Sequence, residues 1–443
     1  MKKYFGTDGV RANSNSKKLN GITLMKLGMA LGKYFTVGGH RHKVVIGKDT
    51  RLSGYMIEQA LTSGLLSMGM DVFLFGPIPT PAVAILTKSM RADLGIMITA
   101  SHNQYQDNGI KIFDKDGNKL SDETEIEIEN LMEADLQKLL INPADIGRAK
   151  RLEDANGRYI EFLKSTFPKS QRLDGLKIVI DCANGASYIS APLILWELGA
   201  EVIPIANEPN GTNINQECGS TNTGLLAKKV LEEKADIGIA LDGDGDRVAI
   251  IDENGILVNG DQIIALLAIE MSKNKKLKRN KVVSTSMANM GLENYLNNND
   301  IQLIRTKVGD RYVKEKMISE NLNLGGEQSG HIIMRDFSSA GDGIVVALQV
   351  LSILISTQKK VSECFKLFNP HPQNLINFPI ENINILNHED TKEFIKSCEE
   401  KVSKDGRIIV RMSGTEPLLR VMIESGSQQT IDELTESVTR YFS

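Results

Sequence analysis

Short apolar runs alternate with amphipathic stretches along most of the chain. Runs such as Lys43 to Gly47 and Asp71 to Phe75 suit buried strands, and stretches such as Tyr55 to Met70 have the apolar spacing of a helix. Repetition of strand, loop and helix is typical of α/β proteins with mostly parallel sheets. We expect further helices at Ala82 to Met90, Ile189 to Leu198, Leu225 to Lys234, Asp261 to Met271 and Arg311 to Glu320, further strands at Asp93 to Thr99, Leu176 to Asp181, Glu201 to Pro204, Ala235 to Ala240, Val248 to Asp252, Lys281 to Thr285 and Gln302 to Thr306, and a turn at Gly325-Gly326.

The periodicity lapses near Asn142 to Asp154, near Asn254 to Gly260, and at Phe368 to Gln373, where prolines end the preceding helix. From about Asn374 the tail reads strand, helix, strand, strand, helix. A chain of 443 residues is too long for one ordinary core. We therefore predict an α/β protein of four domains, residues 1–153, 154–254, 255–368 and 369–443: three similar domains with mixed or parallel sheets, then a small α+β domain.

The composition and charge of the chain argue against some classes of binding partner. The net charge of −4 argues against a nucleic-acid or anionic-membrane surface, and no apolar run is long enough to span a membrane. The N-terminal residues lack a secretory signal, and the four cysteines are scattered, so we expect a cytoplasmic protein with reduced thiols. The six histidines lack the spacing of a typical zinc site.

The run Asp242-Gly243-Asp244-Gly245-Asp246-Arg247 lies between two predicted strands. Three carboxylates crowded into one loop repel one another unless a cation lies among them, and hard oxygen ligands suit Mg²⁺. A solvated acidic turn is the simplest alternative. An EF-hand matches at the three aspartates and at Glu253, but Arg247 replaces the required glycine and the flanking strands replace its helices. A third alternative makes Asp242 itself a phosphoryl-accepting nucleophile.

Further loops carry compatible chemistry. Thr99 to Asn103 follows a predicted buried strand, which places Ser101 at a sheet edge where α/β proteins bind ligands, and Lys111 lies shortly beyond. In Gly325 to His331, Glu327 and Ser329 are two apart and, on extended backbone, could point together at sugar hydroxyls. Arginines and small residues that commonly bind phosphate occur in Arg411 to Thr415 and at Arg420, and basic, glycine-edged loops occur at Gly6 to Arg11 and Gly47 to Arg51.

With these four motifs in this order, the chain resembles the α-D-phosphohexomutase superfamily over essentially its whole length. The Thr99 loop resembles the family's phosphoserine loop, the Asp242 loop its metal loop, the Glu327 loop its sugar-recognition loop and the Arg411 loop its phosphate-binding loop. Within the superfamily it most resembles the bacterial group that acts on glucosamine phosphates, because of the Gly6 to Arg11 run, Gln328 and Gly414; Ala12, where that group usually has glycine, is a small departure.

The resemblance implies four domains around a central cleft and interconversion of glucosamine 6-phosphate and glucosamine 1-phosphate, which feeds UDP-N-acetylglucosamine and cell-wall precursor synthesis. Phosphorylated Ser101 would donate its phosphoryl group to the sugar, and the resulting 1,6-bisphosphate of glucosamine (or glucose) would serve as intermediate and activator. Mg²⁺ would be held by Ser101, Asp242, Asp244 and Asp246. The implied catalytic residues are Ser101, Lys111, Arg11, His102 and His331, and the implied substrate-binding residues are Arg247, Gly309, Glu327, Ser329, Arg411, Ser413, Gly414, Thr415 and Arg420.

Other functions stay open on the sequence. A phosphomannomutase or phosphoglucomutase of the same superfamily would use the same motifs. An aspartyl-phosphate phosphatase would use Asp242 and give Ser101 no role, and a sugar-phosphate sensor would bind without turnover. We expect a small-molecule sugar phosphate as the partner and a monomer or homodimer as the assembly.

Overall fold

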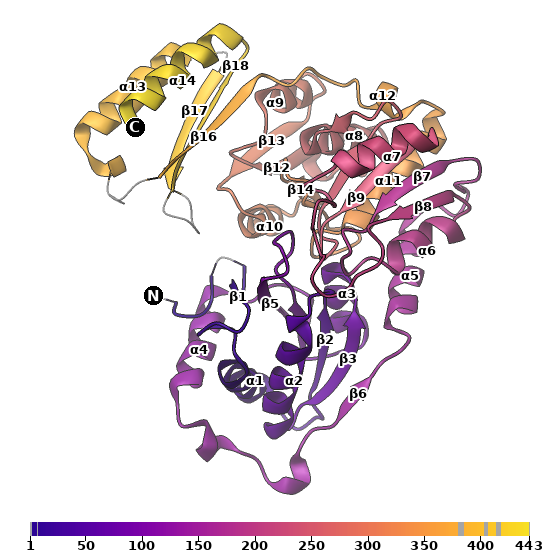
Figure 1. Ribbon diagram of the computed structural model, residues 1–443, viewed down its shortest axis with the longest axis vertical. Coiled ribbons are helices and arrows are strands. Elements are labelled where there is room, and N and C mark those ends of the chain that lie inside the picture. Colours follow the sequence, from indigo (N-terminus) through magenta and orange to yellow (C-terminus); the bar gives the residue numbers. More distant parts are fainter. Residues whose placement is uncertain (1, 7, 380–384, 403–405, 413–417, 443) are drawn as a thin grey trace. The chain divides into compact units, whose positions relative to one another are not determined.

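The computed structural model describes residues 2–6, 8–379, 385–402, 406–412 and 418–442, which Figure 1 draws as a coloured ribbon. The chain divides into two compact units. The first comprises Met1–Met287 and Ile301–Lys366, and the second comprises Ala288–Asp300 and Leu367–Ser443. No helix among the described residues is long and apolar enough to cross a membrane.

The first sheet has the order β1-β5-β4-β2-β3-β6. Strands β4, β2, β3 and β6 run parallel, and the β1 and β5 edge is antiparallel. Figure 1 shows α1 and α2 side by side, and both supply leucines to the core beneath the sheet. The elements are β1 Val10–Asn13, α1 Gly21–Phe35, β2 Lys43–Lys48, α2 Ser53–Ser67, β3 Asp71–Pro77, α3 Thr80–Ser89, β4 Leu94–Ile98, β5 Asp107–Asp114, α4 Asp122–Glu133, 3₁₀ turns at Leu136–Leu139 and Pro143–Asp145, and β6 Ala149–Arg151.

The second and third sheets repeat this plan of a parallel core with an antiparallel edge. Their orders are β11-β10-β9-β7-β8 and β13-β12-β14-β15, with β10, β11 and β15 antiparallel. The elements are α5 Ala155–Thr166, β7 Lys177–Asp181, α6 Ser190–Glu197, β8 Glu201–Ile205, α7 Gly224–Glu233, β9 Ile237–Leu241, β10 Val248–Ile251, β11 Leu257–Val258, α8 Gly260–Lys273, a 3₁₀ turn at Lys278–Asn280, β12 Lys281–Thr285, α9 Met290–Asn297, β13 Gln302–Thr306, α10 Asp310–Ser319, β14 Leu324–Gly326, β15 Ile332–Met334, α11 Gly343–Thr357 and α12 Val361–Cys364.

The second unit is built on an antiparallel sheet of order β16-β18-β17, so the predicted small α+β tail is confirmed. Helix α9 belongs to this unit: the Met290 N–H donates to Glu424 on β18 (2.7 Å), and the Asn289 amide donates to the His371 carbonyl (2.9 Å). The elements are β16 Gln373–Pro379, a 3₁₀ turn at Ile385–Asn387, α13 Glu389–Val402, β17 Gly406–Met412, β18 Leu418–Ser425 and α14 Gln428–Phe442.

The predicted alternation of strands and helices with mixed or parallel sheets is confirmed, but the turn at Gly325-Gly326 is wrong. These glycines end β14, which pairs with β12. A Cβ atom on Gly325 would lie 2.6 Å from the Met317 sulfur. The glycines therefore permit close packing inside a sheet rather than a change of chain direction.

Candidate functional site

Ser101 lies just beyond the carboxyl end of β4. Its backbone has φ +52°, a left-handed conformation that is uncommon for serine, and its N–H donates to the Thr99 hydroxyl (2.9 Å). The side chain is 2% exposed, and its Oγ donates to Oδ2 of Asp242 at 2.6 Å. Strained backbone of this kind is concentrated at functional sites. The fold thus brings the two residues that the sequence proposed as nucleophile and metal ligand into direct contact.

A fully buried arginine holds the Ser101 loop in place. Arg51 donates to the carbonyls of Ser101 (2.9 Å) and Asn103 (2.7 Å), and its Nε donates to Asp49 (2.8 Å). The Asn215 amide donates to the same two carbonyls at 2.8 Å. Burial raises the pKa of Asp49, although the Arg51 charge opposes this shift. From the sequence, Gly47 to Arg51 is recognisable only as a basic loop, and Asn215 is not singled out. The local pattern does not show that Arg51 is buried or that Arg51 and Asn215 contact the Ser101 loop.

Asp242, Asp244 and Asp246 lie on the β9–β10 hairpin, as predicted, and all three are buried. Their nearest carboxylate oxygens lie within 4.8 Å of one another. The EF-hand alternative is excluded because strands flank the loop and because Glu253 accepts from the N–H of Ser362 (3.1 Å) instead of joining the cluster.

The donor set of this loop fits a hard divalent cation. Oδ1 of Asp244 and Oδ1 of Asp246 are both buried and accept no hydrogen bond among the described residues, although His331 Nδ1 lies 3.4 Å from the Asp246 atom, so each residue has an oxygen available as a ligand. The other oxygens of these residues are occupied: Lys111 Nζ donates to both at 2.8 Å, and the Thr80 hydroxyl donates to Asp244. Thr80, on α3, is a contact that sequence reasoning missed.

The pKa values within this cluster shift in opposite directions. Burial and the neighbouring charges of Asp246 and Asp244 raise the pKa of Asp242 well above its usual range. Despite burial, the Lys111 and His331 charges hold the pKa of Asp246 well below its usual range. Burial alone would lower the pKa of Lys111, but the facing carboxylates of Asp244 and Asp246 outweigh burial and raise this pKa. Lys111 is therefore a buried cation that offsets the charge of the three aspartates.

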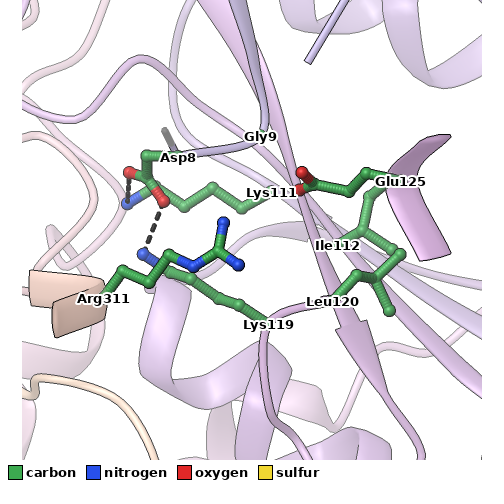
Figure 2. Close-up of a pocket in the computed structure, with 8 residues that line it drawn as sticks. All are labelled: Asp8, Gly9, Lys111, Ile112, Lys119, Leu120, Glu125 and Arg311. Atoms are coloured by element: carbon green, nitrogen blue, oxygen red, sulfur yellow. Dashed lines mark hydrogen bonds and ion pairs between the residues drawn. The ribbon is translucent and has the colours of Figure 1, made fainter. Parts of the chain in front are cut away.

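Lys111 also belongs to a chain of alternating charges beside a small cavity, shown in Figure 2. Its Nζ lies 3.8 Å from Asp8, which contacts Lys119, and Lys119 lies 2.6 Å from Asp310. His331 completes the chain: its Nε2 lies 3.6 Å from Asp310 and its Nδ1 lies 3.4 Å from Asp246. Although burial opposes it, the Asp246 charge raises the pKa of His331. Asp8 belongs to the Gly6 to Arg11 loop. Lys119 and Asp310 lie outside all the motifs found in the sequence.

The other candidate catalytic residues in this unit surround the same loop. His102 Nδ1 lies 3.4 Å from Ser101 Oγ, and burial with the nearby charges of Arg247 and Arg11 lowers the pKa of His102 to about 4. The Arg247 N–H donates to Asp242 Oδ1 (3.1 Å), while its Nε lies 4.0 Å from Asp246. Arg11, on β1, lies 3.6 Å from Asp8. Arg247 thus contacts this loop directly, and His102 reaches it through Ser101. Arg11 reaches it through Asp8 and Lys111.

The Glu327 loop turns tightly, so the expectation of extended backbone from Glu327 to Ser329 is wrong. The Gly330 N–H donates to the Glu327 carbonyl at 3.0 Å, which closes the turn. Glu327 is half-buried and accepts from the Gly309 N–H (3.1 Å), whereas Ser329 is exposed. Gly309, with φ +128°, caps α10. The structure therefore groups Glu327 with Gly309 and leaves the Ser329 hydroxyl at the surface.

Gly330 joins this loop to the β9–β10 hairpin by a backbone hydrogen bond, and its position leaves no room for a side chain. It has φ +85°, its carbonyl accepts from the Val248 N–H (3.1 Å), and an added Cβ would lie 2.0 Å from the Val248 carbonyl oxygen. We expect Gly330→Ala to lower the free energy of unfolding in urea by about 3 kcal/mol or more, since strain and steric overlap add. Gly157→Ala on α5, where nothing lies within 4 Å, is the control and should stabilise slightly. Equal effects of both changes would contradict this account.

Asp342 links two of the α/β segments at the start of α11. It caps the helix through the Val345 N–H (3.0 Å) and accepts from the Tyr159 hydroxyl on α5 (2.9 Å). Burial is the main cause that raises its pKa from 3.8 to about 6. Between these two pKa values the folded protein retains a proton that the unfolded chain loses. The stability that this group contributes therefore falls as the pH rises from 3.8 to about 6.

Asp342→Asn keeps an acceptor for the cap but cannot ionise. Relative to the wild type, the variant should gain on the order of 3 kcal/mol in unfolding free energy between pH 4 and pH 7, from the cost per pKa unit. Urea unfolding of both proteins at the two pH values measures this difference. A difference that does not change with pH would contradict the assignment.

The second unit carries Arg411 and Arg420 directly opposite each other on β17 and β18. Burial and the Arg420 charge lower the pKa of Arg411. Two like charges at opposed positions repel each other and favour an anion between them. Ser413, Gly414 and Thr415 lie outside the described residues.

Comparison with known proteins extends over the whole chain. Sequence profiles of the phosphoglucomutase/phosphomannomutase family match in order: alpha/beta/alpha domain I at residues 2–138, domain II at 157–255, domain III at 259–371 and the C-terminal domain at 375–440. Similar curated proteins include phosphoglucosamine mutases of Parvibaculum lavamentivorans (54% identical, covering 99% of this chain and 98% of the relative) and Maricaulis maris (55% identical, 99% and 97%).

Solved structures share the fold at lower identity. A phosphoglucomutase/phosphomannomutase family protein from Burkholderia thailandensis superposes with a TM-score of 0.82 at 22% identity, covering 99% of this chain and 97% of its own. The Aspergillus fumigatus N-acetylphosphoglucosamine mutase, solved in complex with GlcNAc-6P and magnesium, gives 0.67 at 18% identity, covering 99% and 95%.

Proposed function

The chain belongs to the phosphoglucomutase/phosphomannomutase family, and from this premise we propose that it is an intramolecular phosphotransferase that interconverts glucosamine 6-phosphate and glucosamine 1-phosphate. The amino sugar is proposed because relatives more than half identical over nearly their full length are phosphoglucosamine mutases. Within the molecule, the observation that carries the proposal is the 2.6 Å contact between Ser101 Oγ and Asp242.

That contact favours Ser101 over Asp242 as the nucleophile. In the proposed reaction, the bond from phosphorus to Oγ of phosphorylated Ser101 breaks as phosphorus bonds to the free hydroxyl oxygen of the sugar phosphate. The proton of that hydroxyl is transferred to Oγ of Ser101, so the step releases no net proton. The 1,6-bisphosphate then reorients, and its other phosphoryl group returns to Ser101 by the reverse step. Transfer of this kind depends mainly on positioning and electrostatics.

The residues around Ser101 would hold the metal ion, fix the Ser101 loop, transfer the proton and stabilise charge, according to their positions. Asp242, Asp244, Asp246 and an oxygen on Ser101 would hold Mg²⁺, which when bound neutralises charge on the transferring group. Arg51 and Asn215 fix the backbone of the Ser101 loop. His102, 3.4 Å from Oγ, is placed to take or return the Ser101 proton, and Lys111, Arg11, His331 and Arg247 stabilise charge beside the loop.

Substrate recognition is assigned to the remaining candidates. Glu327, oriented by the Gly309 N–H, would accept from sugar hydroxyls, with the exposed Ser329 beside it. Arg411 and Arg420 would clamp the phosphate that is not reacting, together with Ser413, Gly414 and Thr415. Such a clamp must accept either phosphate of the intermediate, which suits a site remote in sequence from Ser101.

The choice of sugar is tested by steady-state kinetics. We expect kcat/KM for glucosamine 6-phosphate to exceed that for glucose 6-phosphate and mannose 6-phosphate by at least about 10-fold, the factor a single good hydrogen bond supplies. Assays with Mg²⁺ and a trace of 1,6-bisphosphate measure all three substrates. A preference for glucose or mannose phosphate would overturn the amino-sugar assignment and leave the phosphohexomutase reaction intact.

A further inference from the structure

Two histidines and an aspartate converge at the edge of the first sheet where β2 and β4 begin. His40 and His42 precede β2, and Asp93 precedes β4. The three offer ligand atoms that all lie within 4.8 Å of one another, and the two imidazole rings are 4.1 Å apart. His40 Nε2 lies 2.8 Å from Asp93 Oδ1, and His42 Nδ1 lies 3.5 Å from the same oxygen.

The imidazole of His42 forms no hydrogen bond within the described part of the chain. The residue is 3% exposed, and both ring nitrogens are buried without a hydrogen-bond partner among the described residues. A buried polar group without a partner is rare, because its desolvation costs about 1–3 kcal/mol. Its Nδ1 faces the Asp93 carboxylate, at the centre of the cluster.

The backbone around the cluster prepares it for a ligand. The Lys43 N–H donates to Asp93 Oδ2 (2.8 Å), which orients that carboxylate and leaves Oδ1 toward the imidazoles. Arg41, between the two histidines, is engaged by Asp71 (2.7 Å), so its charge is neutralised away from the cluster. Metal sites commonly depend on such outer hydrogen bonds to orient a ligand.

We propose that His40, His42 and Asp93 form a binding site for a transition-metal dication such as Zn²⁺, with water completing the coordination. Imidazole and carboxylate ligands suit Zn²⁺, Ni²⁺ and Cu²⁺, and three protein ligands with an open position are a common arrangement. Ligand atoms bound to a tetrahedral zinc ion are about 3.3 Å apart, so small movements of the exposed His40 complete the geometry. Histidine spacing gave no sign of this site because Asp93 lies far along the chain.

This site is separate from the metal loop of the phosphoryl-transfer chemistry. Asp93 precedes β4 and Ser101 follows it, so roughly 20 Å of extended chain separates the two ends. A metal here would tie the segment before β2 to the start of β4 and would take no part in turnover. The inference therefore does not depend on the proposed function.

Zinc titration of the full-length, chelator-treated protein tests the site, with excess Mg²⁺ present to compete with Zn²⁺ for the oxygen-rich Asp242 to Asp246 loop. Calorimetry should show one Zn²⁺ equivalent in the wild type that weakens at least 10-fold in His40→Asn and in Asp93→Asn. His388→Asn, which removes an exposed histidine elsewhere, is the matched control and should bind as the wild type does.

Zn²⁺ should also raise the Tm of the wild type and the control but not that of His40→Asn. His40→Asn is the decisive variant because its side chain is 60% exposed and its loss should not unfold the protein. Equal isotherms for wild type and His40→Asn would overturn the proposal, as would the absence of a high-affinity Zn²⁺ equivalent in the wild type.

Discussion

Replacing Ser101 with alanine is expected to lower mutase kcat by at least about 10⁴-fold, the scale on which removal of a catalytic nucleophile acts. The hydroxyl is buried against Asp242, and within the described residues no other hydroxyl group donates to that carboxylate. Stability should fall by about 1–3 kcal/mol, because alanine fits the same space but leaves Oδ2 of Asp242 buried without its hydrogen-bond donor.

The residue that carries the phosphoryl group can be identified by labelling, which tests the mechanism directly. Protein incubated with labelled 1,6-bisphosphate should carry acid-stable phosphate on Ser101, and Ser101→Ala should carry none. Ser165→Ala on α5, whose hydroxyl bonds only to the Phe162 carbonyl among its described contacts, is the matched control and should retain full activity and labelling. Label on Asp242 would instead select the aspartyl-phosphate mechanism.

Replacing Asp242 with asparagine is expected to change activity and stability in opposite directions. Activity should fall by about 10³-fold, because a neutral amide is a poorer ligand for Mg²⁺ and lowers the charge of the metal loop. Stability of the metal-free protein at neutral pH should rise, because burial and two neighbouring carboxylates disfavour the charged form of Asp242.

The sign of the stability effect follows from linkage. The pKa of Asp242 is raised in the folded protein, so ionisation of this group destabilises the fold increasingly as pH rises above its usual pKa. Thermal unfolding in the presence of a chelator measures this effect, and added Mg²⁺ should raise the Tm of the wild type more than that of the variant. Asp116→Asn, an exposed residue, is the control. A variant less stable than the wild type without metal would contradict this reading of the cluster.

The local pattern of apolar and polar residues was sufficient to predict the α/β architecture, because most helices and strands can be identified from a few consecutive residues. The predicted strands at Lys281 to Thr285 and Gln302 to Thr306 coincide with β12 and β13. A helix was expected before Phe368, but no bounds for α11 could be predicted, because its residues are apolar on nearly every side and no amphipathic stripe marks them. The β5 strand was overlooked because its antiparallel pairing with β4 and β1 decides its conformation.

The candidate site divides in the same way. The acidic loop and the Ser101 loop were identifiable because each packs its chemistry into a short run at the end of an apolar strand. Arg51, Asn215 and Thr80 were not, because their roles come from contacts with residues far along the chain. The Glu327 turn was misjudged because its geometry is imposed by the close approach of Gly330 to Val248.

The sequence by itself determined the alternation of strands and helices, the four loops that carry chemistry and the family to which they belong, since all of these follow from local patterns. Only the tertiary structure decided which groups meet. It places Ser101 against Asp242 across 141 residues, sets Lys111 between Asp244 and Asp246, and brings His42 to Asp93. The physical reason is that burial and charge pairing arise where distant segments pack, and a linear pattern does not specify those distances.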